Sequence, residues 1–194
     1  MSGMSPAPVP DWMFPPEGGF TPEDLDHLPD LPPHTELIDG SLILASPQAH
    51  FHSLALDMLE SALSRTLPRD LRVRREITVS LGPTQRPEPD MTVFDRSAAL
   101  TRTSIGVDGV LLVVEVVSPE SRDRDRKRKP ELYAEAGIKH FWLIEDSGGE
   151  SVLSTYELDE LTHSYVPTGI HHGSAKLSIP YPIEIDFSEI DDLA

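Results

Sequence analysis

Residues 110–117, Val-Leu-Leu-Val-Val-Glu-Val-Val, constrain the fold more than any other stretch of this chain. Seven of these eight residues are apolar and most are β-branched, and Gly109 and Ser118-Pro119 bound the run. Such a run predicts a strand that is buried on both faces. Glu115 interrupts it, and an ionised carboxylate in such a strand costs several kcal/mol unless it is paired or coordinated. A structural ion pair and a metal site both remain open as the reason for Glu115.

A basic run lies directly after this strand, at residues 122–129. It holds six of the sixteen Lys and Arg residues against two Asp, a local charge of +4 in a chain whose formal charge is −17. An acidic chain is a poor general nucleic-acid binder, so a polyanionic substrate would have to be met at this one place. The arginines and lysine at 122, 124, 126, 127 and 128 are interpreted as phosphate-positioning or as solvated charges.

Composition excludes several classes of protein. With 194 residues the chain fits one domain, and it has no cysteine, which excludes disulfides, cysteine-based zinc sites and a thiol nucleophile. No run approaches the ~20 apolar residues that a membrane helix needs, so no membrane partner is expected. The N-terminus has no apolar segment of the secretory type, and we expect a cytoplasmic protein.

The chain divides into a proline-rich arm over residues 1–20, expected to be disordered, and a single domain over residues 21–194. Capping and periodicity predict helices at 21–28, 49–67 and from Pro130 to Gly137. Alternation and turn residues predict a hairpin at 35–44, with an Asp39-Gly40 turn, and strands at 71–81, 90–95, 139–145, 151–158, 163–168 and 183–187. Residues 96–109 are predicted to be a polar connection.

This order gives a helix, three strands, a helix and a strand over residues 49–145. It predicts a mixed α/β core whose sheet is widened by the β-strands before and after it. Pattern alone does not separate a three-stranded meander from parallel strands at its centre.

A metal centre for phosphodiester hydrolysis needs oxygen ligands, usually one or two carboxylates with water and phosphate. Asp90 opens one predicted strand and Glu115 lies within the next. If those strands pair, both carboxylates converge on a single Mg²⁺ or Mn²⁺ ion, with the backbone carbonyl of Val116 as a further ligand. Lys129 is then a candidate to stabilise charge or to assist deprotonation of water.

At these residues the chain resembles a known group. Pro89-Asp90 followed by Glu115-Val116-Val117 resembles the PD-(D/E)XK nuclease superfamily. More closely, the chain is similar to the Uma-two family of restriction-endonuclease-like bacterial proteins over about residues 21–190. The matching residues are 36–40 (Glu-Leu-Ile-Asp-Gly), His50, Pro89-Asp90, 115–119 (Glu-Val-Val-Ser-Pro), Asp125, Lys129, 133–138 (Tyr-Ala-Glu-Ala-Gly-Ile) and Phe141-Trp142.

The resemblance implies a restriction-endonuclease-like domain, with a mixed sheet flanked by helices, that hydrolyses DNA with Mg²⁺ or Mn²⁺. Asp90 and Glu115 would hold the ion, and Glu36 would complete the site. The chain departs from the superfamily at Val117, where a catalytic lysine is usual, and Lys129 on the following helix is expected to replace it. A homodimer is natural for cutting two strands.

The sequence also leaves alternatives open. One alternative is a non-catalytic nucleic-acid-binding or regulatory protein that has kept the fold. The acidic surface favours a non-catalytic role, because most sequence-reading nucleases offer a broad basic face. The roles of His50 and Asp125 stay undecided, and His50 is judged more promising than His52 as a residue of the site.

Overall fold

The structure is a computed structural model that describes residues 10–45 and 47–191. Residues 1–9 of the expected arm lie outside this part. Within the rest of the arm, Asp11–Met13 form a short 3₁₀-helix. Phe20 is buried, and its N–H donates a hydrogen bond of 2.8 Å to the carbonyl of Gly40. The last residue of the expected arm therefore packs with the domain.

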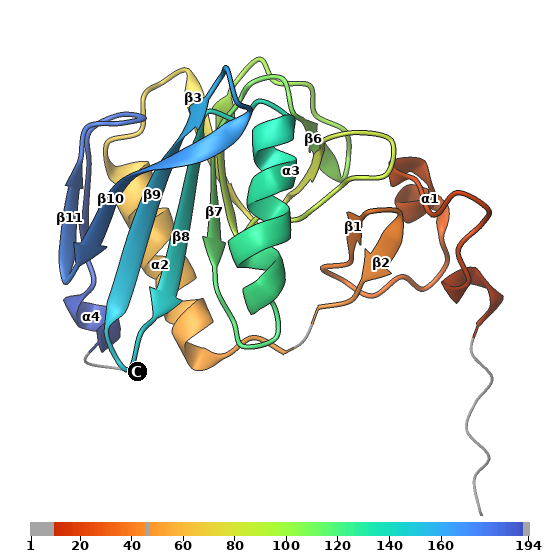
Figure 1. Ribbon diagram of the computed structural model, residues 1–194, viewed down its shortest axis with the longest axis horizontal. Helices are drawn as coiled ribbons and strands as arrows, with labels where there is room; N and C mark the ends of the chain where they lie inside the picture. Colours follow the sequence, from red (N-terminus) through yellow and green to blue (C-terminus); the bar gives the residue numbers. More distant parts are fainter. Residues whose placement is uncertain (1–9, 46, 192–194) are drawn as a thin grey trace, which may run out of the picture.

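A mixed six-stranded sheet forms the centre of the described chain (Figure 1). Its strands lie in the order β10 (Ser164–His172), β9 (Ser151–Asp159), β8 (His140–Asp146), β7 (Val110–Val116), β5 (Met91–Asp95) and β3 (Leu71–Arg75). Neighbouring strands are antiparallel except for β7 and β8, which are parallel. The strands β3, β5 and β7 thus form the meander that the sequence left undecided, and the crossover to β8 carries a helix.

Two helices cover opposite faces of this sheet (Figure 1). The helix α2 (His50–Arg65) buries Ala55, Leu56, Leu59 and Leu63 against one face. The helix α3 (Lys129–Glu135) packs on the other face, where Tyr133 joins a cluster with Phe141 and Val113. This arrangement confirms the predicted α/β class and positions α3 directly after β7.

Side chains alternate along β7 between these two cores. Val114 and Val116 belong to the α2 side, whereas Val113 and Val117 belong to the α3 side. Because successive side chains of a strand point to opposite faces, Glu115 faces α3. Glu115 is 1% exposed, so the predicted doubly buried strand is confirmed.

Several local predictions agree with the structure. The helix α1 (Pro22–His27) begins at a capping box between Thr21 and Asp24, as its sequence indicates. The hairpin of β1 (Glu36–Ile38) and β2 (Ser41–Ile43) turns at Asp39-Gly40, where both residues have positive φ. After α3, Gly137 takes φ 81°, and the N–H groups of Gly137 and Ile138 close the helix on the carbonyls of Ala134 and Tyr133.

The predicted single strand over residues 71–81 is wrong. It is broken at Glu76, whose φ of 47° ends β3, and the chain then enters β4 (Thr78–Ser80). The strand β4 pairs in parallel with β6 (Ser104–Gly106), inside the stretch predicted to be a polar connection. Periodicity across residues 71–81 was misleading because both halves alternate without sharing a sheet.

The helix predicted to begin at Pro130 begins earlier. Residues Arg124–Arg128 form a π-helical turn that runs directly into α3, so most of the basic run is helical. At the C-terminal end, β11 (Ser174–Leu177) pairs with β12 (Ile183–Asp186), and the short helix α4 (Ser188–Asp191) follows. These elements lie on the α2 side, where Ile183, Ile185 and Phe187 extend the core.

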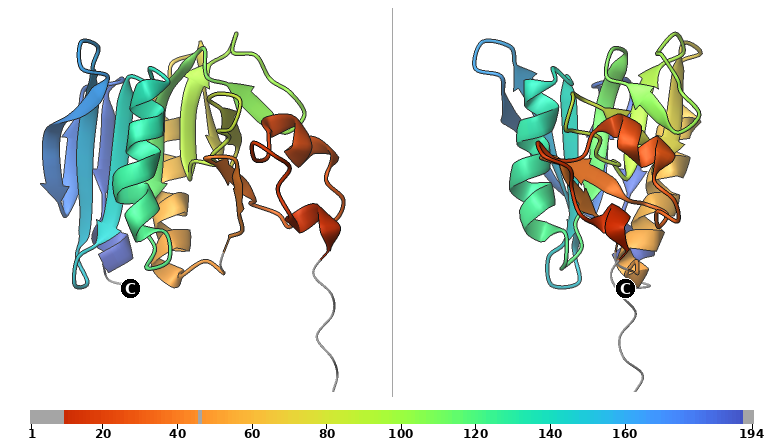
Figure 2. Two further views of the ribbon diagram at one scale, coloured as in Figure 1. Left: turned by 45° about the vertical axis from the view of Figure 1, so that its right-hand side comes forward. Right: turned by 90° about the vertical axis from the view of Figure 1, so that its right-hand side faces the viewer.

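The β1–β2 hairpin lies at one edge of the domain, between α2 and α3 when that edge faces the viewer (Figure 2, right). It is attached through Leu37, which exchanges backbone hydrogen bonds of 3.0 and 2.7 Å with Arg86. Among the described residues, no helix is long and apolar enough to cross a membrane.

Candidate active site

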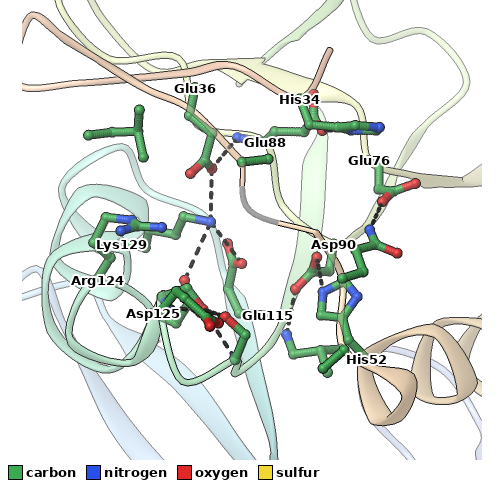
Figure 3. Close-up of a pocket in the computed structure, with 18 of the residues that line it drawn as sticks. His34, Glu36, His52, Glu76, Glu88, Asp90, Glu115, Arg124, Asp125 and Lys129 are labelled. Atoms are coloured by element: carbon green, nitrogen blue, oxygen red, sulfur yellow. Dashed lines mark hydrogen bonds and ion pairs between the residues drawn. The ribbon is translucent and has the colours of Figure 1, made fainter. Parts of the chain in front are cut away.

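A cavity of about 400 Å³ opens where the β1–β2 hairpin meets the end of β7 (Figure 3). Its walls come from the hairpin, the start of α2, the segment before β5, the end of β7 and the π-helical turn before α3. Glu36, Asp90, Glu115, Val116 and Lys129 all line it. The fold thus brings all five residues predicted for catalysis or metal binding to one cavity.

Glu115 is held by two side chains of α3. The ammonium of Lys129 donates to Glu115 Oε2 at 2.9 Å, and the hydroxyl of Tyr133 donates to Oε1 at 2.5 Å. Burial raises the pKa of Glu115 well above its ordinary value; Lys129 opposes this rise, and Asp125, Asp90 and Glu36 add to it. The buried carboxylate therefore has an ammonium partner, which offsets the free energy cost of burying its charge in the strand.

Lys129 is shared among three carboxylates. Its Nζ lies 2.8 Å from Glu36 Oε1, 2.9 Å from Glu115 Oε2 and 3.5 Å from Asp125 Oδ1. Burial alone would lower the pKa of Lys129, but the attraction of the acids around it raises that pKa well above its ordinary value. Lys129 is accordingly a buried ammonium and not one more solvated charge of the basic run.

The π-helical turn sets the direction of Lys129. The backbone N–H of Lys129 donates to the carbonyl of Arg124, five residues earlier, instead of four as in an α-helix. Asp125 and Lys129 both point into the cavity from this turn, and Asp125 is 1% exposed (Figure 3). Burial raises the pKa of Asp125, whereas Lys129 lowers it. Asp125, whose role the sequence left open, thus belongs to the ion-pair cluster.

Asp90 reaches the cavity from the residue before β5 and is held differently from Glu115. Its Oδ1 lies 2.9 Å from Nε2 of His52, and its Oδ2 accepts a hydrogen bond of 2.6 Å from the backbone N–H of Val116. Asp90 therefore lies beside the α2 layer while Glu115 lies beside α3. Both carboxylates line the same cavity.

The histidine at the site is His52, whereas His50 is exposed at the first residue of α2. The preference for His50 is therefore not supported by the geometry. Burial lowers the pKa of His52, but its bond to Asp90 and the nearby acids raise it above its ordinary value. Helical spacing contained the signal, because His52 precedes Ala55 and Leu56 by three and four residues on the buried face.

Glu36 is positioned by the hairpin and by the loop after β4. Its Oε1 accepts a hydrogen bond of 2.8 Å from the backbone N–H of Glu88 as well as the contact from Lys129. The hairpin turn is tied to the π-helical turn before α3, since Arg128 contacts both carboxylate oxygens of Asp39 at 2.6 and 2.8 Å. Two independent attachments thus place Glu36 over Lys129.

The cavity carries an excess of negative charge. Of the described residues that line it, seven are acidic (Glu36, Glu76, Glu88, Asp90, Glu115, Glu120 and Asp125), and two are lysine or arginine, Lys129 and Arg124. Burial also raises the pKa of Glu88, against the opposing effect of His34 at 2.6 Å. The seven acidic side chains therefore outnumber the lysine and arginine side chains that could neutralise their negative charge.

Oxygen ligands for a cation are therefore abundant, but they are not arranged as a closed cage. Within residues 10–45 and 47–191, no three His, Asp or Glu side chains converge as a metal-binding group. A magnesium ion in proteins usually takes one or two carboxylates and keeps several waters, so a closed cage is not required for it.

Comparisons with known proteins agree with this fold. The crystal structure described as "a putative nuclease belonging to DUF820", from Anabaena variabilis, has a TM-score of 0.56 at 18% identity, covering 83% of this chain and 89% of that one. At this identity the likeness establishes the restriction-endonuclease-like fold alone. No curated protein matches the chain in sequence.

Two weaker structural likenesses are to NucC proteins. The cAAA-bound NucC of Pseudomonas aeruginosa has a TM-score of 0.35 at 10% identity, covering 63% of this chain and 85% of that one. The apo NucC of Escherichia coli MS115-1 has a TM-score of 0.34 at 12% identity, covering 63% and 82%. Both scores are too low to support an inference about this chain.

The family model named Uma2, described as "Putative restriction endonuclease", matches residues 22–191 and so spans the hairpin, the cavity and the whole central sheet. The resemblance drawn from the sequence is confirmed, and the chain belongs to the Uma2 family.

Proposed function

We propose that this protein is an endonuclease that hydrolyses DNA phosphodiester bonds with Mg²⁺ or Mn²⁺. The observation that supports it most is the convergence of Asp90, Glu115 and Lys129 on one acidic cavity. These residues come from separate segments, and two of them are buried charges at 1% and 4% exposure. Burying charge in this way is costly, and perturbed ionisable groups that share a cavity are typical of catalytic sites.

The residues present fit a divalent cation. Asp90, Glu115 and the carbonyl of Val116 would hold it, and carboxylate and carbonyl oxygens are ligands that Mg²⁺ and Mn²⁺ prefer. Burial raises the pKa values of Glu115 and Asp125, and repulsion from neighbouring acids adds to the rise, whereas Lys129 opposes it. A cation would relieve this repulsion, and when bound it would polarise the phosphate and generate a nucleophilic hydroxide from water.

The side chains around that position have separate tasks in this proposal. Because its pKa is raised, Lys129 stays protonated at neutral pH, which favours stabilising the charge that develops on the phosphate over removing a proton from water. Glu36 and Asp125 hold the ammonium from two sides. Tyr133 and His52 fix the orientation of Glu115 and Asp90.

The acidity of the cavity supports a requirement for metal. A phosphodiester is an anion, and seven acidic side chains around the cavity would repel it. A divalent cation held by these carboxylates would offset that repulsion.

Incubation of supercoiled plasmid with Mn²⁺ or Mg²⁺ tests the proposal. We expect nicked and linear products with wild type, none with EDTA, and none with Glu115→Ala. Glu184→Ala is the matched control, because it removes an exposed carboxylate that does not line the cavity. This variant is expected to cleave normally. Cleavage of RNA in place of DNA would change the substrate class, and no cleavage of either would refute the nuclease proposal.

One rival function has a specific observation in its favour. Arg126, Lys127 and Arg128 are paired with acidic residues, which leaves little free positive charge in the basic run for DNA. A non-catalytic binding or regulatory protein, or a purely structural ion-pair network around Lys129, would fit this feature. Calorimetric titration with Mn²⁺ separates the cases: the nuclease proposal expects binding that is lost in Asp90→Asn, and the ion-pair network expects no binding.

We also propose that the active form is a homodimer, because two cavities are needed to cut both strands in one encounter. Light scattering in the presence of a short duplex measures the mass of the complex. A monomer on the duplex that yields linear plasmid would contradict the proposal.

A further inference from the structure

The basic run contains one arginine whose surroundings differ from those of its neighbours, and it is Arg124. Arg126 is paired with Glu145 at 2.6 Å, Lys127 with Asp123 at 3.2 Å, and Arg128 with Asp39 at 2.6 Å. The ammonium of Lys129 is shared by three carboxylates. Arg122 is exposed and does not line the cavity. The four residues 126–129 are therefore already engaged within the protein.

Arg124 lines the cavity and makes none of the ion pairs found in the described part of the chain. Its Nε is buried and has no hydrogen-bond partner. A buried N–H without a partner costs about 1–3 kcal/mol, and buried donors in proteins are nearly always paired. In a cavity lined by seven acidic side chains, a guanidinium without a carboxylate partner points to a partner that the protein itself does not supply.

The position of Arg124 follows from the π-helical turn. Because the N–H of Lys129 donates to the carbonyl of Arg124, these two residues lie one turn apart on the same helical segment. Both line the cavity, with Asp125 beside them (Figure 3). A ligand that contacts Lys129 is therefore within the region that Arg124 also lines.

We propose that Arg124 contacts the substrate and holds a backbone phosphate of the nucleic acid at this cavity. The inference rests on the proposed nuclease function and adds the residue that binds the anion. A guanidinium presents a planar fork of N–H donors that matches two phosphate oxygens, which an ammonium cannot do. In this proposal Lys129 stays paired with the carboxylates of the cavity, whereas Arg124 is free to bind the phosphate of the substrate.

Cleavage kinetics with Arg124→Ala and Arg124→Lys test the proposal. We expect Arg124→Ala to lower kcat/KM by roughly 10- to 100-fold, the effect of losing one hydrogen bond to a charged group. Arg124→Lys should recover only part of this loss, because it keeps the charge without the fork. Arg126→Ala is the matched control, since Arg126 lies in the same π-helical turn as Arg124 but is paired with Glu145.

A readout specific to phosphate contact is the salt dependence of binding. Fluorescence anisotropy with a short DNA duplex in Mg²⁺ is measured in the Glu115→Gln background, where turnover does not interfere. Removing one phosphate contact should reduce the slope of log Kd against log salt by about one unit in Arg124→Ala and leave it unchanged in Arg126→Ala. A loss of folding alone would not produce this difference between slopes.

The two proposals fail in different ways. If wild type cleaves DNA and Arg124→Ala matches it in kcat/KM and in salt slope, the role of Arg124 is refuted and the nuclease function stands. If wild type does not cleave, the nuclease function fails, and the binding measurement still decides Arg124. Equal affinity and equal slope in that case also refute a phosphate contact.

Discussion

The ammonium of Lys129 lies 2.8 Å from Oε1 of Glu36, and this contact joins the helix after β7 to a hairpin more than ninety residues earlier in the chain. The same ammonium holds Glu115 at 2.9 Å. Lys129 therefore connects the sheet, the hairpin and α3 at the candidate active site. Changes to any of these attachments should affect the site in measurable ways.

Glu115→Gln is expected to alter how stability depends on pH in the absence of metal. The pKa of Glu115 is raised in the folded state, so from about pH 4.5 upward the unfolded chain releases a proton that the folded chain retains. The free energy of unfolding of wild type should then fall relative to Glu115→Gln by up to about 1.4 kcal/mol per pH unit, until the raised pKa is reached.

Urea unfolding of both proteins between pH 4 and pH 8 in EDTA measures this difference. Below the ordinary pKa of Glu the two curves should run parallel. Added Mn²⁺ should stabilise wild type more than the variant at pH 7.5, because the proposed function makes Glu115 a ligand of the ion in the folded state. A difference that does not change with pH would show that Glu115 is already ionised at all these values.

His52→Ala is expected to weaken metal binding and cleavage, whereas His50→Ala is not. His52 holds Asp90 through a contact of 2.9 Å, and the loss of a side chain that orients a metal ligand typically costs about 10- to 100-fold in affinity or activity. The two histidines occupy the same turn of α2, so the pair forms a matched comparison. Mn²⁺ affinity by calorimetry and the plasmid nicking rate are the measurements; equal effects of both changes would contradict the assignment.

Tyr133→Phe removes the hydroxyl that donates to Glu115 at 2.5 Å and leaves the packing of the ring in place. Burial and the nearby Glu115 raise the pKa of Tyr133 well above its ordinary value, so the hydroxyl remains a donor across the working range of pH. We expect a loss of about 1–3 kcal/mol in the free energy of unfolding, because Glu115 loses a buried partner.

Cleavage by Tyr133→Phe should also fall, since Glu115 is then held only by Lys129. Tyr165→Phe is the control: its hydroxyl donates to the carbonyl of Ile138 at 2.8 Å, away from the cavity. If Tyr165→Phe loses a similar amount of stability but cleaves normally, the lower cleavage by Tyr133→Phe is due to the orientation of Glu115 and not to a general loss of stability. Equal loss of cleavage in both variants would assign Tyr133 to the fold alone.

Arg128→Ala and Asp39→Ala are expected to affect turnover more than stability. The pair joins the hairpin turn to the π-helical turn before α3 at the surface, where such ion pairs contribute about 0–1 kcal/mol. Glu36 lies in the same hairpin, so its contact with Lys129 should loosen and kcat should fall. A double-mutant cycle on kcat measures the coupling, with Lys176→Ala as a surface control; fully additive effects would mean that the pair does not position Glu36.

The sequence by itself determined the elements whose signals are local. Seven apolar residues around Glu115 were enough to predict a doubly buried strand, because only such a strand accommodates them. The capping box at Thr21 and the left-handed Gly137 likewise fixed helix ends through bonds between near neighbours in the chain. The residues of the site were predicted from their order along the chain and from the family resemblance.

Only the tertiary structure decided how these residues face one another. The choice of His52 over His50, the pairing of Asp90 with His52 and Val116, and the contact of Glu36 with Lys129 all depend on segments far apart in sequence. The break at Glu76 and the π-helical turn before α3 were also hidden, because hydrophobic periodicity does not encode a change of sheet or of helical pitch. The physical reason is common to all of these: a local pattern fixes which face of an element is buried, whereas packing between elements fixes which charges share one cavity.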